Sequence, residues 1–119
     1  MLLLAYLLNL NPEWSDAKIM VRSIVENEKE RYNMATSLNE LVPAIRIKAV
    51  TEVIVKPADM TVVNVMHSYS RNSDVVFLGL MEPESGAESE YAKRLIELAS
   101  KFNTTIFVRN AGEFAGHLI

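Results

Sequence analysis

The amino-acid sequence predicts an α/β protein built around a parallel sheet, and two observations carry this prediction. The first is an apolar run near the middle of the chain, in which Val75, Val76, Phe77 and Leu78 follow one another without polar alternation. Such a run is typical of a strand that is buried on both faces. The second is that strand-like and helix-like segments alternate every 10–15 residues or so, the pattern of right-handed βαβ crossovers. We therefore expect a three-layer parallel sheet with helices on both faces and residues 74–80 as its central strand.

The other elements follow from residue spacing and residue type. Apolar residues at three- and four-residue steps predict helices over Leu2–Asn9, 27–44, 62–69 and 88–102. Segments rich in β-branched residues predict strands over 17–25, 48–56 and 104–109. We expect Asp59 or Thr61 to cap the third helix, and the strand over 17–25 to be more exposed than the central one.

Composition limits the classes of protein that the chain can belong to. Its 119 residues, half of them hydrophobic, fit one domain over residues 1–119. The sequence has no cysteine, which excludes disulfides, thiolate nucleophiles and cysteine-ligated metals. A net charge of −3 and a pI near 5.4 argue against a nucleic-acid partner, which would need a basic surface. The first ten residues are apolar but about half as long as the ~20 residues a membrane span requires, so we expect no direct membrane insertion.

Gly79 is the one candidate for a binding site. In open α/β sheets ligands bind beyond the carboxyl ends of the strands, and Gly79 could let the backbone approach a phosphate there. The residues that follow are acidic, however: Glu82, Glu84, Glu88 and Glu90. Because carboxylates repel a phosphate, we expect a solvated acidic loop and no bound nucleotide or other cofactor.

No other residue pattern points to catalysis or to a metal. Glu82 and Glu84 stand two apart in a loop, which fixes no distance between their carboxylates. His67 falls on a helix, where we expect it to be partly exposed, and its spacing to His117 does not suit metal ligation. Tyr91 is expected in the core. The sequence lacks the glycine-flanked turn of a nucleophilic serine at all three of its neighbouring serines, Ser68, Ser70 and Ser73. The sequence thus predicts neither an enzyme nor a metal site.

Several segments, taken in order, resemble a known family. They are AYLLNLNPEW, VTEVIV, SDVVFLGLMEPESG, YAKRL and TTIFVRNAGEFAG, and together they look like the carboxy-terminal cytosolic domain of the cation-chloride cotransporter family in its prokaryotic form. The resemblance covers nearly the whole chain and is most specific at the central strand and at the final AGEFAG. It implies a fold similar to universal stress proteins. It also implies a fragment of a longer transporter that acts on the cytoplasmic side of the cell membrane.

The function implied by this resemblance is regulatory and not catalytic. Such domains form homodimers and contact the membrane domain of their own transporter. The dimer surface is not assigned by the resemblance, although the amino-terminal leucines and the tail around Phe114 are candidates because they are apolar. A free-standing interaction protein unrelated to transport is a weaker interpretation.

A different class of function is also open. Universal stress proteins that bind ATP carry further glycines after the fourth strand, but counting from Gly79 those positions are held here by Glu82, Ala92 and Lys93. The resemblance therefore does not extend to ATP binding. The alternative function is a sensor of small ligands such as nucleotides, which would use the crevice after Gly79 and the loop after Val55.

The predicted elements lack the first strand of the universal stress fold, which lies between the strands over 17–25 and 74–80. Unpaired backbone groups in a core are costly, so the gap needs a solution. Either residues 2–8 are themselves that strand, or another chain supplies it, or the two flanking strands pair directly. We expect the last, with exchange between chains as the next choice.

Overall fold

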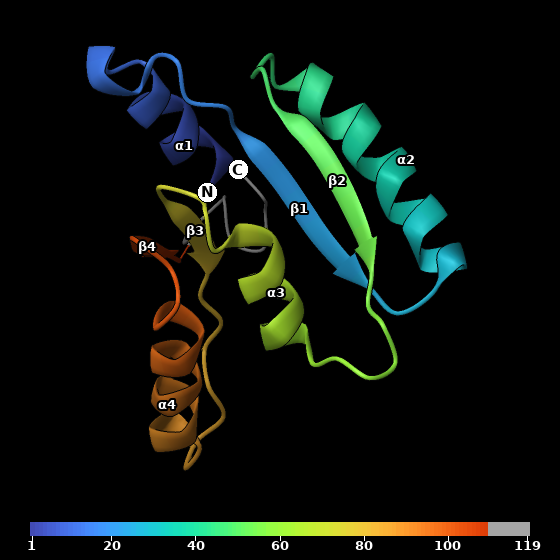
Figure 1. Cartoon of the computed structure of the whole chain (residues 1–119), viewed down its shortest axis with the longest axis vertical. Helices are drawn as coiled ribbons and strands as arrows, with labels where there is room; N and C mark the ends of the chain where they lie inside the picture. Colours follow the sequence, from blue (N-terminus) through green and yellow to red (C-terminus); the bar gives the residue numbers. More distant parts are fainter. Residues whose placement is uncertain (110–119) are drawn as a thin grey trace. The chain divides into compact units, whose positions relative to one another are not determined.

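A computed structural model of the chain describes residues 1–109 (Figure 1). Four α-helices alternate with four strands, as the sequence predicts, and a short 3-10 helix, η1, follows the first helix. The α/β class is therefore confirmed. In chain order the elements are α1 (Leu2–Asn9), η1 (Pro12–Trp14), β1 (Met20–Val25), α2 (Glu28–Ala44), β2 (Val50–Val55), α3 (Val62–Ser70), β3 (Val76–Gly79), α4 (Glu88–Ala99) and β4 (Thr105–Val108).

The predicted bounds agree to within one residue for α1, α2, α3 and β4, and the largest differences lie at the start of β1 and the end of α4, where side chains bond to the backbone. β1 begins three residues later than predicted because Ala17 belongs to a turn: its N–H donates to the carbonyl of Trp14, and its own carbonyl accepts from the Asn9 side chain. α4 ends three residues early because the hydroxyl of Ser100 donates to the carbonyl of Glu97 at 2.6 Å and closes the last turn.

The strands pair in parallel, as predicted, but in two sheets of two strands each among residues 1–109. β1 pairs with β2 from Met20 opposite Val50 to Val25 opposite Val55, and β3 pairs with β4 from Val76 to Gly79. Helix α2 thus connects β1 to its partner β2, and α4 connects β3 to its partner β4. The strands over 17–25 and 74–80 belong to different compact units of the chain, so their direct pairing stays a prediction, whereas α1 excludes a strand over 2–8. A strand from another chain and the three-layer, universal stress-like arrangement stay predictions.

The chain divides into two compact units, and the single domain over residues 1–119 stays a prediction. The β1–β2 unit is Leu3–Val62, and the β3–β4 unit is Met1–Leu2 together with the chain from Val63 on. In the β1–β2 unit α2 runs beside β2 and packs on both strands (Figure 1). Its core is formed by residues of all three elements and the segment that joins α2 to β2: Val25, Leu38, Val42, Ile47 and Ile54.

In the β3–β4 unit the buried side chains come from helix α3, from the segment between α4 and β4, and from Leu2, which is 4% exposed. Val65 is fully buried, and His67 and Phe102 are 8% exposed. β3 itself is half-buried along Val76, Phe77 and Leu78, and Gly79 is exposed. The prediction of a strand buried on both faces, and less exposed than β1, is therefore wrong: β3 contains no fully buried residue and ends at an exposed glycine, whereas β1 ends at the buried Val25.

Helix α1 is short and consists mostly of leucine. It has eight residues, and only Leu2 among them is buried. Within the described part of the chain, no helix combines the length and the apolar character needed to cross a lipid bilayer.

Candidate functional site

Gly79 closes strand β3 and is exposed, but its surroundings do not require a glycine. A Cβ atom added there would lie 3.5 Å from Cε of Met1, which is an ordinary van der Waals contact. Its φ angle lies outside the left-handed region, because Gly86 is the one glycine of the described chain with a positive φ. Neither space nor backbone conformation therefore marks Gly79 as a place that must stay open for a ligand.

The residues just after Gly79 are bonded to the protein itself. The backbone N–H of Met81 donates to the hydroxyl oxygen of Tyr91 at 2.9 Å, and Nη2 of Arg109 lies 3.3 Å from Oε2 of Glu82. Tyr91 is half-buried, so the prediction that it lies in the core is wrong. These contacts tie the loop after β3 to α4 and to the end of β4.

The amino end of α4 is filled by a carboxylate of its own first turn. Gly86, with a φ of 90°, donates its N–H to Oε2 of Glu88 at 2.9 Å, and the N-cap residue Ala87 offers no side-chain oxygen. Glu88 and Glu90 both lie in this first turn, where the helix dipole favours negative charge. An anionic ligand would have to displace Glu88 and face Glu90, so this helix end does not suit a phosphate.

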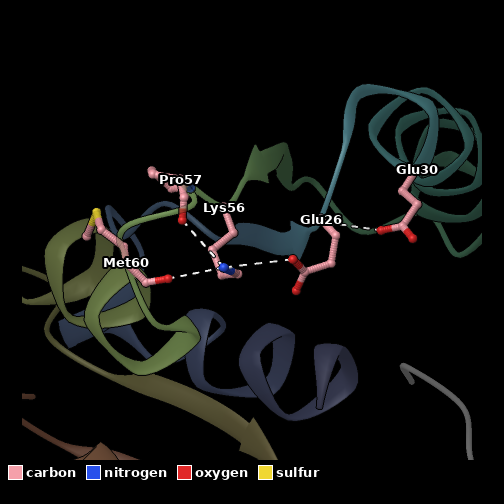
Figure 2. Close-up of polar contacts among 5 residues, drawn as sticks. All are labelled: Glu26, Glu30, Lys56, Pro57 and Met60. Atoms are coloured by element: carbon pink, nitrogen blue, oxygen red, sulfur yellow. Dashed lines mark hydrogen bonds and ion pairs between the residues drawn. The ribbon is translucent and has the colours of Figure 1, made fainter.

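The carboxyl ends of β1 and β2 meet at Lys56 (Figure 2). The side chain of Lys56 is only 17% exposed, and its Nζ donates to the carbonyl of Met60 at 3.1 Å and to that of Pro57 at 3.4 Å. Oε2 of Glu26 lies 3.8 Å from the same nitrogen. We call Lys56, Glu26, Pro57 and Met60 the Lys56 cluster. The loop after Val55 thus turns carbonyl oxygens toward the strand end, and they are already engaged by an ammonium group.

Glu26 also belongs to the capping arrangement of α2. Oδ1 of Asn27 accepts the N–H of Glu30 at 2.9 Å, and Oε2 of Glu30 accepts the N–H of Glu26 at 2.9 Å (Figure 2). This reciprocal pattern resembles a capping box, in which two backbone N–H groups at a helix start are satisfied at once. The bond from Glu30 holds the backbone of Glu26, the residue whose carboxylate faces Lys56.

The sequence did not predict the Lys56 cluster. The signal that could have found it is the register: Val25 lies opposite Val55, so the next residues of the two parallel strands, Glu26 and Lys56, are neighbours. A lysine and a glutamate that each follow an apolar strand are the pattern to look for.

His67 differs from the prediction of a partly exposed residue. It is buried, its Nε2 donates to the carbonyl of Leu98 at 2.7 Å, and its ring meets that of Phe102 edge-on. Ser68 is exposed, and the backbone carbonyl of Ser73 accepts a hydrogen bond from the Asn103 side chain.

Two residues named from the sequence, Phe114 and His117, lie outside the described residues. Within residues 1–109 no three carboxylate or imidazole side chains come together as metal ligands would.

Comparison with known proteins gives no further assignment. No family model, no curated protein and no solved structure matches the chain.

Proposed function

We propose that the chain is a non-catalytic regulatory and dimerisation domain of a cation-chloride cotransporter, acting on the cytoplasmic side of the cell membrane. Support comes from the order of the sequence segments that resemble that family. It comes also from the α/β architecture with two parallel βαβ pairs, which suits a universal stress-like domain. The partners would be a second copy of the chain and the membrane domain of the transporter.

One observation favours a non-catalytic role above the others: the strand ends where an α/β protein would hold a ligand are engaged by the protein's own groups. The ammonium group of Lys56 donates to the carbonyls of Pro57 and Met60, and the carboxylate of Glu88 accepts the N–H of Gly86. A nucleotide at these places would have to displace Glu88 from Gly86 or the two carbonyl oxygens from Lys56. This favours a domain that works through contacts with other protein surfaces.

A ligand screen separates this proposal from the nucleotide sensor. We expect the melting temperature of the chain to stay constant when ATP, AMP or a cyclic nucleotide is added at millimolar concentration, with magnesium alone as the control. A ligand that binds the folded state raises the melting temperature with concentration, by linkage. A rise of that kind with any nucleotide would overturn the proposal in favour of the sensor.

A binding experiment tests the transporter partner directly. The chain, carrying an affinity tag, is expected to retain a detergent-solubilised cation-chloride cotransporter whose own carboxy-terminal domain has been removed. An unrelated membrane transporter of similar size is the control. Equal retention of the two, or of neither, would count against the transporter assignment. So would a gene in which no twelve-span transporter shares the reading frame.

A further inference from the structure

Helix α1 presents leucine side chains to solvent on one side. Leu3 and Leu4 are each 44% exposed, Leu7 is 52% exposed and Leu10 is 61% exposed. Leu10 continues the helical register because its N–H donates to the carbonyl of Tyr6 at 3.1 Å. Steps of four and three residues from Leu3 to Leu7 to Leu10 place these side chains in a row, as in a helix that packs against another helix. We call Leu3, Leu4, Leu7 and Leu10 the leucine face; all four belong to the β1–β2 unit.

The helix that carries the leucine face is fixed at its carboxyl end. Nδ2 of Asn9 donates to the carbonyl of Trp14 at 2.8 Å and to that of Ala17 at 3.0 Å. Oδ1 of Asn11 accepts the N–H of Glu13 at 3.0 Å and caps η1. The segment between α1 and β1 is therefore held by side-chain bonds, and a partner that binds the face would order little additional chain.

The size of the face is that of an interaction surface. Four leucines, each about half exposed, offer on the order of a few hundred Å² of apolar surface, comparable to the largest apolar patch of a typical monomer, which is often functional. With a second helix of the same kind, the contact would be at the small end of specific interfaces. We therefore expect association that depends on concentration, and not an obligate complex.

The charge of α1 decides between occupants. Neither end of the helix carries an acidic or basic residue, and the first charged residue of the chain is Glu13. A helix that lies on a lipid surface depends on Lys or Arg along its polar side, which α1 lacks. A twofold contact, by contrast, sets each residue against the same set of residues on the other copy. A face without charge can meet itself without like-charge repulsion, although each copy carries a net charge of −3.

We propose that the leucine face is where two copies of this chain associate, with α1 of one copy packed against α1 of the other. Leu3, Leu7 and Leu10 would interdigitate with their counterparts across a twofold axis. This inference rests on the proposed function in one respect, the homodimer, and gives that dimer its contact surface.

Analytical ultracentrifugation of the full chain over a range of concentrations tests the proposal. Leu7→Lys is expected to raise the dimer dissociation constant by at least about tenfold, since it places a charge at the centre of an apolar contact. Ile96→Lys is the matched control: Ile96 is 70% exposed on α4, in the other unit, and its change should leave the constant unaltered. Far-ultraviolet circular dichroism checks that both variants are folded.

A cross-linking experiment keeps the test decisive if Leu7→Lys fails to fold. Because the sequence has no cysteine, Leu7→Cys introduces a single thiol, and oxidation should produce a disulfide-linked dimer far faster than for Ile96→Cys.

Slower or equal cross-linking at position 7, or a dimer that Leu7→Lys does not weaken, overturns the leucine face but leaves the proposed function standing. A nucleotide-induced rise in melting temperature, together with a dimer that Leu7→Lys dissociates, overturns the function and leaves the face. A strict monomer at every concentration overturns the face and the homodimer together.

Discussion

Nε2 of His67 lies 2.7 Å from the carbonyl oxygen of Leu98 and donates a hydrogen bond to it, which joins α3 to the last turn of α4. The carbonyls of a last helical turn have no partner within the helix, so this bond satisfies a group that would otherwise be left without one. The ring of His67 also meets that of Phe102 at a centroid distance of 5.2 Å and an interplanar angle of 71°. His67 is therefore a structural residue of the β3–β4 unit.

Replacing His67 should destabilise the protein. His67→Ala removes the bond to Leu98, the edge contact with Phe102 and a buried side-chain volume, so we expect the free energy of unfolding to fall by about 2–4 kcal/mol. Urea denaturation measures this change. Ser68→Ala, at the exposed neighbouring position, should alter stability by less than about 0.5 kcal/mol. Similar losses in the two variants would show that the bond to Leu98 contributes nothing specific.

The Lys56 cluster should stabilise the β1–β2 unit mainly through hydrogen bonds to carbonyls. Lys56→Met keeps the side-chain length but removes the donor to Pro57 and Met60, and should lower the free energy of unfolding by about 1–2 kcal/mol. Glu26 is 64% exposed and lies 3.8 Å from Lys56, so Glu26→Gln should cost less than about 0.5 kcal/mol. Thermal unfolding compares the two variants with Lys48→Met, an exposed control. A larger loss for Glu26→Gln than for Lys56→Met would mean that the ion pair dominates.

Arg46 follows the end of α2 with a φ of 57°, a conformation that favours glycine. Its N–H donates to the carbonyl of Pro43 at 3.1 Å, a bond that glycine keeps. Arg46→Gly should therefore raise the free energy of unfolding, by up to about 1 kcal/mol, because the strain of a side chain in the left-handed region is removed. Glu40→Gly, at an exposed position inside α2, should instead lower it by about 1 kcal/mol. Destabilisation by both changes would contradict the left-handed conformation of Arg46.

Local patterns predicted the helices well because their signals lie within a few residues. The leucine spacing of α1 and the apolar periodicity of α2 are such signals, and the bounds agree with the structure to within one residue. The start of β1 and the end of α4 were missed because the side chains of Asn9 and Ser100 bond to nearby carbonyls and end the regular backbone. Apolar spacing does not report such bonds.

Features that depend on contacts between distant residues were harder to predict. The apolar run of β3 indicates a strand but not how many neighbours it has, and it proved half-buried beside β4. The burial of His67 depends on Leu98 and Phe102, more than 30 positions along the chain, and the Lys56 cluster depends on the register of β1 against β2. The acidic loop after Gly79 was recognisable from its residues, whereas the bond from Gly86 to Glu88 required the turn geometry.

Thr105, the first residue of β4, gives a last prediction. Its Oγ1 is buried and has no hydrogen-bond partner within residues 1–109, and a buried polar group without a partner lowers stability. Valine has nearly the same shape and no hydroxyl, so Thr105→Val should raise the free energy of unfolding by up to about 1 kcal/mol in urea denaturation. Thr104→Val, at the exposed preceding residue, separates this effect from strand propensity and should change stability by less than about 0.5 kcal/mol. A loss of stability in Thr105→Val would reveal that the hydroxyl is bonded in solution.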